Sequence, residues 1–306
     1  MKNLRQEFSD LMLETGKKDK RLVVMVGDIS HGLLKPFAKK FPNRYYNIGI
    51  CEPSMVNLAA GMSKLNLIPV VHTIAPFLIE RSYEQIKLDF GYQKLGVNLI
   101  SVGSSFDYSK LGCSHHTYAD VSLINHIKNT NIIIPGSVVE FNTLFKKIYK
   151  RKSINYFRLT EYSHGVTFTK SQIKFGKGIV VKRGKDLTIC VIGSQLKNVL
   201  EANKTLEKLG VCVEILYFHT FKPFDKDLVK KSVEKTKKLL TVENLSATDG
   251  LYSRCLDSCV NSFNFSVKQI AIKDFVLGYG TYDELCSKAK ISTLDIIKES
   301  KKLLKI

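Results

Sequence analysis

The chain has 306 residues, a hydrophobic fraction of 44% and a formal net charge of +19. This length suffices for two domains of ordinary size, and the apolar content favours folded cores over a disordered chain. No apolar run reaches the roughly 18 residues that a membrane helix needs, and the start of the chain lacks a signal-peptide pattern. The sequence therefore predicts a cytoplasmic protein that has no membrane contact.

The charge and the cysteines narrow the function classes further. The excess of 47 Lys and Arg over 28 Asp and Glu is dispersed along the chain, with no aromatic-interleaved basic stripe. Solvated faces explain this charge better than an acidic partner or an anionic ligand, and we predict no nucleic-acid binding. The seven cysteines include no CxxC pair, which argues against disulfides and structural zinc. Cys255 and Cys259 are expected to pack in a core.

In the first half of the chain, short β-branched runs without charge alternate with helical patterns. Such runs are typical of buried parallel strands. The strand-like runs are 21–28, 68–73, 97–103, 131–135 and 154–159, and the helical patterns are 4–16, 53–65, 77–89, 119–128 and 138–150. This alternation predicts an α/β doubly wound sheet over residues 1–165.

A glycine-rich stretch follows, and then the alternation restarts. Residues 163–185 hold four glycines and little helical periodicity, so we predict a linker over 166–185 that ends in a hairpin. Strands are then expected at 187–193, 211–218, 238–244 and 267–272, and helices at 195–208, 225–235 and 250–262, with two short helices at the end. Residues 186–306 are therefore predicted to form a second, smaller α/β domain.

Glu52 is a candidate site residue at a strand-to-helix junction. A strand ends near Ile48, and a helix is expected to begin at Pro53, since proline is favoured in a first helical turn. Open α/β sheets build their sites at the carboxyl ends of strands. An acid at that place also stabilises a helix N-terminus, and spacing alone favours this structural role. The chain carries no GxGxxG, GxxxxGK[ST], HExxH or GxSxG motif that would point to another chemistry.

Two further segments carry candidate residues. His115 and His116 lie in a Gly- and Ser-containing loop before a helix. Adjacent side chains diverge, so the pair is poorly suited to one metal, and a binding role and hydrogen bonding to the loop backbone are equally supported. Phe77 follows the strand at 68–73, and its position alone is most simply that of a core residue.

Together these segments resemble the transketolases. The residues that carry the resemblance are N-I-G-I-C-E at 47–52, A-A-G at 59–61 and S-H-H at 114–116 in the first half, and GKDLTICVIGSQ at 184–195, FHTFKPFD at 218–225, LLTVEN at 239–244 and DGLYSRC at 249–255 in the second. The resemblance covers essentially the whole chain. It implies two doubly wound domains, a thiamine diphosphate-binding pyrimidine-type domain followed by a transketolase C-terminal-type domain.

The resemblance also implies roles at a cofactor site. Glu52 would hydrogen-bond the pyrimidine ring of thiamine diphosphate and act as the catalytic acid, while the cofactor supplies the difficult chemistry. Phe77 would stack on the same ring, Ile50 would line its pocket, and Asp28 would lie near the cofactor at a subunit interface.

A second group of implied roles concerns the substrate. His115 would take part in catalysis and bind a substrate hydroxyl, and Arg5 and Arg158 would grip a sugar phosphate, for which the guanidinium fork is suited. The chain departs from the family at two places: Gly32 stands where a serine is usual, and Leu111 where an acid is usual. A histidine expected among residues 102–112 is missing as well. These losses predict a specialised pathway, with a modified or nucleotide-linked sugar as acceptor.

One absence points to a second chain. Transketolases hold the diphosphate and its Mg²⁺ or Ca²⁺ with a GDG…N motif on an N-terminal domain, and this sequence has neither that motif nor a stretch before residue 1 to carry it. We therefore expect no metal ligands here. We expect an N-terminal transketolase subunit as partner, and self-association into an α2β2 heterotetramer.

The resemblance thus predicts the C-terminal subunit of a split transketolase that transfers a two-carbon ketol unit between sugars. The alternatives are the β subunit of a 2-oxo acid dehydrogenase E1, whose signature usually reads T-P-I-x-E, and a non-catalytic structural subunit. The joint presence of Glu52, Phe77 and His115 argues against the last.

Overall fold

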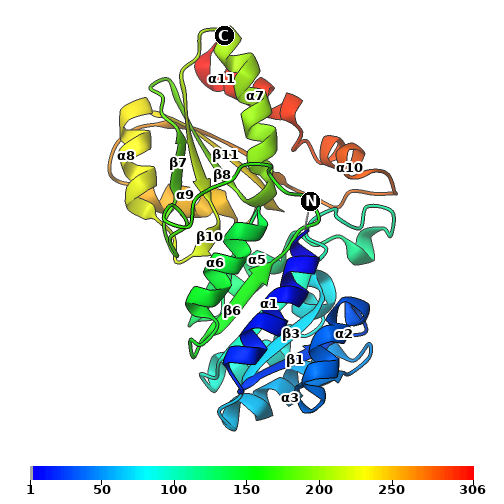
Figure 1. Cartoon of the computed structure of the whole chain (residues 1–306). Coiled ribbons are helices and arrows are strands. Elements are labelled where there is room, and N and C mark those ends of the chain that lie inside the picture. The colour runs from blue at the N-terminus through cyan, green and yellow to red at the C-terminus, as the bar shows by residue number, and fades with distance from the viewer. Residues whose placement is uncertain (1–2) are drawn as a thin grey trace.

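Two mainly parallel sheets, each covered by helices on both faces, stand one above the other (Figure 1). The computed structural model describes residues 3–306. The order of the first sheet is β10-β5-β6-β4-β3-β1-β2, and that of the second is β12-β11-β8-β9-β7. This arrangement confirms the predicted class of two doubly wound α/β domains.

The elements of the first sheet largely follow the predicted runs. Its strands are β1 (Leu22–Val26), β2 (Tyr45–Asn47), β3 (Ile68–Ile74), β4 (Val97–Val102), β5 (Thr130–Ile133), β6 (Ile154–Arg158) and β10 (Thr220–Lys222). Its helices are α1 (Leu4–Lys18), α2 (His31–Lys40), α3 (Glu52–Lys64), α4 (Tyr83–Gln85), α5 (Asp120–Asn125) and α6 (Val138–Ile148). The sequence did not indicate α2 or β10, whereas the strand expected to end near Ile48 is β2. The segment predicted as a helix at 77–89 is helical but irregular: the α-helical turn α4 lies between two π-helical parts, η2 (Pro76–Glu80) and η3 (Ile86–Tyr92).

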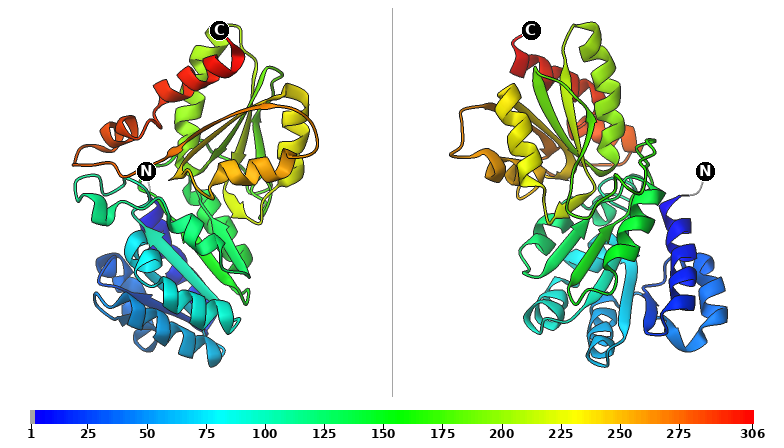
Figure 2. Two further views of the ribbon diagram at one scale, coloured as in Figure 1. Left: turned by 180° about the vertical axis from the view of Figure 1, so that it is seen from behind. Right: turned by 60° about the vertical axis from the view of Figure 1, so that its left-hand side comes forward.

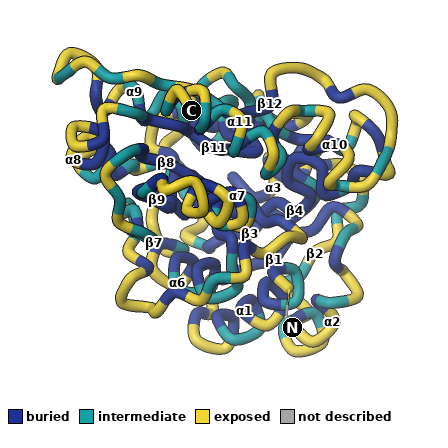
Figure 3. The backbone as a smooth tube through the Cα atoms, turned by 90° about the horizontal axis from the view of Figure 1, so that it is seen from above, coloured by how far each residue is buried: buried dark blue, intermediate teal, exposed yellow. Residues whose placement is uncertain are grey.

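Burial explains why the strands form where they do. Every residue of β1, β4 and β6 is buried, as expected for strands covered on both faces. Alternate strand residues pack against α1, α2 and α6 on one face and against α3 and α5 on the other. Figure 2 shows α1 on the outer side of the sheet, and Figure 3 shows the buried strands at the centre of the molecule.

The second sheet holds the remaining elements. They are β7 (Ile179–Lys182), β8 (Leu187–Ile192), β9 (Val213–Phe218), β11 (Lys238–Ser246) and β12 (Ser266–Ile272), with α7 (Leu196–Lys208), α8 (Lys226–Thr236), α9 (Leu251–Cys259), α10 (Tyr282–Lys288) and α11 (Thr293–Leu304). The expected hairpin is wrong, because β7 pairs antiparallel with β9 and not with its neighbour in sequence, β8. Cys255 and Cys259 are buried in the core, as predicted.

Strand β10 connects the two halves of the chain. It follows β9 in sequence but pairs antiparallel with β5, so it forms the edge of the first sheet. The backbone N–H of Ile134 also donates to the carbonyl of His219 at 2.9 Å. Sequence analysis missed β10 because a three-residue strand carries no measurable period.

A buried polar cluster reinforces this junction. Glu140 on α6 accepts hydrogen bonds from His164 Nε2 at 2.8 Å, from the Tyr217 hydroxyl at 2.7 Å and from the Gly136 N–H at 2.7 Å. Burial opposes ionisation of Glu140, but the hydrogen bond and charge of His164 outweigh it and lower the pKa of the carboxyl. The cluster joins the first domain to β9 of the second. Within the described part of the chain, no helix is long and apolar enough to cross a membrane.

Candidate active site

The predicted cofactor residues follow strand ends at one edge of the first sheet. Asp28 comes after β1, Ile50 and Glu52 after β2, Phe77 after β3, and His115 in the loop after β4. These strands are parallel, so their carboxyl ends meet at the same edge, where open α/β sheets place their sites.

Glu52 is the first residue of α3 and its side chain is only 1% exposed. Its Oε2 accepts a hydrogen bond from Arg81 Nη1 at 2.8 Å. Its Oε1 is buried and has no hydrogen-bond partner among residues 3–306. A buried carboxylate oxygen without a partner is unusual in a folded protein and calls for an explanation. Glu52 therefore keeps the helix N-terminal position expected of a structural acid, and also leaves one acceptor free.

Phe77 and His115, distant in sequence, meet beside Glu52. Phe77 belongs to the π-helical turn η2, and such turns are often found at functional sites. Its ring is only partly buried. The Arg81 guanidinium stacks 4.3 Å above that ring, and the His115 ring contacts it edge-on at 5.2 Å between centroids. Tyr108 extends the group, with its ring 6.2 Å from that of His115. Glu52, Arg81, Phe77, His115 and Tyr108 thus form one continuous cluster.

The two adjacent histidines have different surroundings. Partial burial, and then the charge of Arg81, lower the pKa of His115, so its imidazole is neutral near pH 7 and can bind a hydroxyl. His116 is buried, and its ring contacts that of Phe106, with the two centroids 5.2 Å apart. Only His115 belongs to the cluster, and His116 packs in the loop.

Asn47 of the N-I-G-I-C-E segment shapes the loop that carries Ile50. Its Oδ1 accepts from the backbone N–H of Asp28 at 3.0 Å and of Gly49 at 3.1 Å, and its Nδ2 donates to Asp28 Oδ1 at 3.1 Å. Gly49 has φ +76°, a conformation that glycine adopts without strain. The bridge holds Asp28 against this loop, and it leaves the side chain of Ile50 71% exposed.

Arg5 lies at the same edge, supported from below by a chain of hydrogen bonds. Its guanidinium donates to Ser30 Oγ at 3.1 Å, and Ser30 in turn contacts His72 Nε2 at 2.9 Å. His72 Nδ1 contacts the carbonyl of Ile100 at 2.8 Å, which places the ring proton on Nδ1. Burial lowers the pKa of His72 to about 4, so this chain holds a neutral imidazole. Glu161 Oε1 lies 4.0 Å from Arg5 Nη1.

Arg158 requires a correction, because the structure does not place it where a substrate phosphate could reach it. Its side chain is 1% exposed and pairs with Asp120 at 2.8 Å. It also donates to Ser105 Oγ at 3.0 Å and to the carbonyl of Thr117 at 2.8 Å. These groups inside the chain occupy the guanidinium, so Arg158 fixes the loop that carries His115.

Two of the three departures from the transketolase pattern, Gly32 and Leu111, lie at positions that neighbouring side chains do not cover. A Cβ added at Gly32 would meet no described atom within 4 Å, and Leu111 is 52% exposed. Among residues 3–306, no group of three or more His, Cys, Asp or Glu side chains could hold a metal ion. A flat pyrimidine ring nevertheless fits the groups present: Glu52 Oε1 could accept a hydrogen bond from it, and the Phe77 ring could stack on it.

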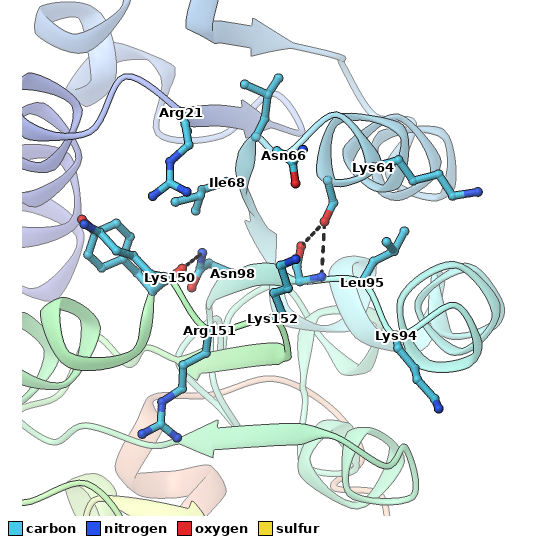
Figure 4. Close-up of a pocket in the computed structure, with 14 residues that line it drawn as sticks. Arg21, Lys64, Asn66, Ile68, Lys94, Leu95, Asn98, Lys150, Arg151 and Lys152 are labelled. Carbon is cyan, nitrogen blue, oxygen red and sulfur yellow. Dashed lines mark hydrogen bonds between the residues drawn. The ribbon is translucent and has the colours of Figure 1, made fainter.

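A separate cavity of about 290 Å³ opens at the opposite, amino-terminal edge of the sheet (Figure 4). It is bordered by cationic side chains, which are Arg21, Lys64, Lys94, Lys150, Arg151 and Lys152. Figure 4 shows Lys64 and Lys94 extending away from the cavity into solvent. None of the candidate active-site residues lines it, so this basic edge is distinct from the cluster around Glu52.

Sequence reasoning missed three residues of the site, Arg81, Tyr108 and Glu161. Arg81 follows Phe77 by four residues at the end of the π-helical turn η2. That spacing was the one signal in the sequence that could have suggested a contact between the two side chains. Tyr108 and Glu161 join the site only through the packing of the loops after β4 and β6, which no local pattern records.

Known proteins match the chain along nearly all of its length. Residues 1–164 match the family described as transketolase, pyrimidine binding domain, and residues 176–296 match transketolase, C-terminal domain. The 6-deoxy-6-sulfo-D-fructose transketolase subunit SqwH of Clostridium sp. (strain MSTE9) is 27% identical over 96% of this chain and 92% of that protein. A 1-deoxy-D-xylulose-5-phosphate synthase of Halothermothrix orenii is 29% identical over 98% of this chain, but over 48% of its own length.

A solved structure gives the same answer. A split gene transketolase, described as an inactive beta4 tetramer, is 28% identical and superimposes with a TM-score of 0.89, covering 99% of this chain and 98% of that one. Both family domains are present, and the SqwH subunit and the split gene transketolase are each covered by this chain over more than nine tenths of their own length. The chain therefore belongs to the transketolase family, of which it carries the pyrimidine-binding and C-terminal domains.

Proposed function

We propose that this chain is the C-terminal subunit of a split, thiamine diphosphate-dependent transketolase that transfers a two-carbon ketol unit between sugars. The observation that carries the proposal is the buried, unpartnered Oε1 of Glu52, beside the Phe77 ring and His115. The similarity to a transketolase subunit of comparable length supports a two-chain enzyme.

In this proposal, each residue of the cluster has its own role in binding the cofactor or the sugar. Glu52 Oε1 accepts a hydrogen bond from the cofactor's pyrimidine ring and so holds a proton at that ring, while Phe77 packs against its face. Thiamine diphosphate supplies the carbanion-stabilising chemistry when bound. Neutral His115 binds a hydroxyl of the sugar and, with Ile50 and Asp28, bounds the cofactor pocket at the subunit interface.

A partner chain completes this site in our proposal. It would be an N-terminal transketolase subunit that holds the diphosphate and its Mg²⁺ or Ca²⁺, in an α2β2 heterotetramer. The beta4 assembly of the solved relative supports self-association of such subunits. The proposal places the enzyme in the cytoplasm, in a specialised pathway whose acceptor is a modified or nucleotide-linked sugar.

Substitution Glu52→Gln tests the proposal. In the reconstituted two-chain enzyme we expect ketol transfer to fall at least about 100-fold, because removing a positioned acid–base group costs roughly 10²–10⁴ in rate. The melting temperature of the chain should change little, since the amide oxygen of Gln can still accept from Arg81. Ketol transfer is followed by product sugars in a coupled assay.

The control is Glu201→Gln on α7, an exposed acid that pairs with Lys204 outside the cluster. Turnover of Glu52→Gln equal to that of this control would exclude the catalytic role and favour a structural subunit. Transfer of an acyl group from a 2-oxo acid, in place of ketol transfer between sugars, would instead favour the 2-oxo acid dehydrogenase alternative.

A further inference from the structure

We propose that Glu161 and Arg5 form the specificity pocket for the far end of the sugar and select an uncharged, hydroxyl-bearing end over a phosphate. The inference rests on the proposed ketol transfer and names the chemical class of its substrates. It starts from the position of Arg158, whose burial leaves Arg5 as the one of the two expected phosphate-binding arginines that a substrate could meet.

The two side chains line the same small cavity. It has a volume of about 370 Å³ and is lined by Asn3, Leu4, Arg5, Leu33, Thr160 and Glu161. One wall is the start of α1, and the other is the segment after β6. Arg5 is the only cationic side chain among the described residues that line it.

Tyr108 connects this cavity to the reaction cluster. Its ring contacts His115, and its hydroxyl is buried without a hydrogen-bond partner in the described part of the chain. Burial raises the pKa of Tyr108, while Arg5 lowers it and Glu161 raises it, so the phenol lies within reach of both charges. A sugar held by His115 would therefore extend past the ring of Tyr108 toward Arg5 and Glu161.

The Arg5 guanidinium and the backbone that carries Glu161 are held in place before any ligand arrives. The buried carboxylate of Asp107 accepts from the backbone N–H of Glu161 and from Thr160 Oγ1, each at 3.0 Å. The next residue, Tyr162, stacks on Tyr282 of α10 with ring centroids 4.0 Å apart. Arg5 is held by Ser30. The pair is thus a built feature of the edge, although the Glu161 side chain remains 43% exposed.

Charge then decides which sugar end fits. Glu161 lies 4.0 Å from Arg5 and offsets its charge, so a phosphate would meet a carboxylate of the same sign and compete with it for one guanidinium. A hydroxyl can donate to the Glu161 carboxylate and accept from Arg5 at the same time. The pocket is therefore complementary to a neutral polyol end and repels a dianion.

The test uses the two-chain enzyme, one ketose donor and matched acceptors, D-glyceraldehyde and D-erythrose with their terminal phosphates. For the wild type we expect kcat/KM to be at least as high for each free aldose as for its phosphate. Glu161→Arg should raise the phosphate-to-free ratio at least about tenfold, which corresponds to about 1.4 kcal/mol. Glu161→Gln should raise it less, and both changes should appear mainly in KM.

Glu201→Arg serves as the matched control, since it makes the same charge reversal on an exposed helix outside the cavity. A wild-type preference of more than tenfold for the phosphates would overturn the inference, as would ratios for both Glu161 variants within twofold of the control. These results leave ketol transfer intact and so spare the proposed function. Absence of transfer to all four acceptors would overturn this inference, whereas the comparison of Glu52→Gln with wild type tests the proposed function separately.

Discussion

Arg81 shows how much a single side chain contributes to this site. Its guanidinium covers the Phe77 ring and donates to Glu52, the two groups that we assign to the pyrimidine. Only one partner of this ion pair is accessible to solvent, since the Arg81 side chain is 44% exposed and that of Glu52 is 1% exposed. Arg81 therefore keeps a buried acid satisfied on one side in the free chain.

Removing that partner should destabilise the chain. We expect Arg81→Met to lower the free energy of unfolding by roughly 1–3 kcal/mol, because a buried carboxylate loses its hydrogen bond. Arg81→Lys should lose less, since it retains a positive charge. Urea denaturation of the isolated chain measures the effect. Equal stability of wild type and Arg81→Met would show that Glu52 finds another partner.

At this scale the sequence predicted some site residues and failed on others for a physical reason. Glu52, Phe77 and His115 occur in segments whose resemblance to a family is local, and the structure brings them together. Arg158 was wrong because a residue type does not reveal whether a side chain points to solvent or to a buried acid such as Asp120. Arg81, Tyr108 and Glu161 depend on tertiary contacts alone.

Among the elements, long segments with clear periodicity were predictable and short ones were not. The runs that became β1, β3 and β4 are rich in β-branched residues and carry no acidic or basic side chain except His72, a pattern that indicates buried strands. Helix α2 was missed because Pro36 interrupts its pattern. Strand β10 has three residues, so it exists because the neighbouring strand β5 offers hydrogen bonds.

His72 on β3 ties together β4 and the loop after β1, and this gives the fold a pH dependence. Burial lowers its pKa from 6.5 to about 4, so between these values the unfolded chain binds the proton and the folded chain does not. Its contribution to stability is thus full above pH 6.5 and is lost as the pH falls toward 4. The loss should be on the order of 3 kcal/mol.

The substitution His72→Gln removes this titration. We expect the difference in unfolding free energy between wild type and His72→Gln to shrink as the pH is lowered from 7 to 4. His126→Gln is the control, because His126 is 62% exposed. Parallel pH profiles for wild type and His72→Gln, measured by chemical denaturation, would contradict a neutral buried imidazole.

At the scale of the whole molecule, our proposal makes the site on this chain half of an active centre. The sequence has no GDG motif for the diphosphate, so the isolated chain should bind thiamine diphosphate at least about 100-fold more weakly than the two-chain enzyme, a difference of about 2.7 kcal/mol. Titration calorimetry with cofactor and Mg²⁺, with and without the partner, measures this. Comparable affinity in both samples would mean that the chain holds the diphosphate itself.

Strand β10 has a consequence for how this protein can be divided. The two family matches meet near residue 170, which suggests a place to cut the gene. A fragment that ended there would leave β5 as a bare sheet edge, because its neighbour is encoded some fifty residues later, and uncovered edges recruit other chains. We therefore expect gene fission or domain shuffling in proteins with this strand exchange to keep both domains on one chain.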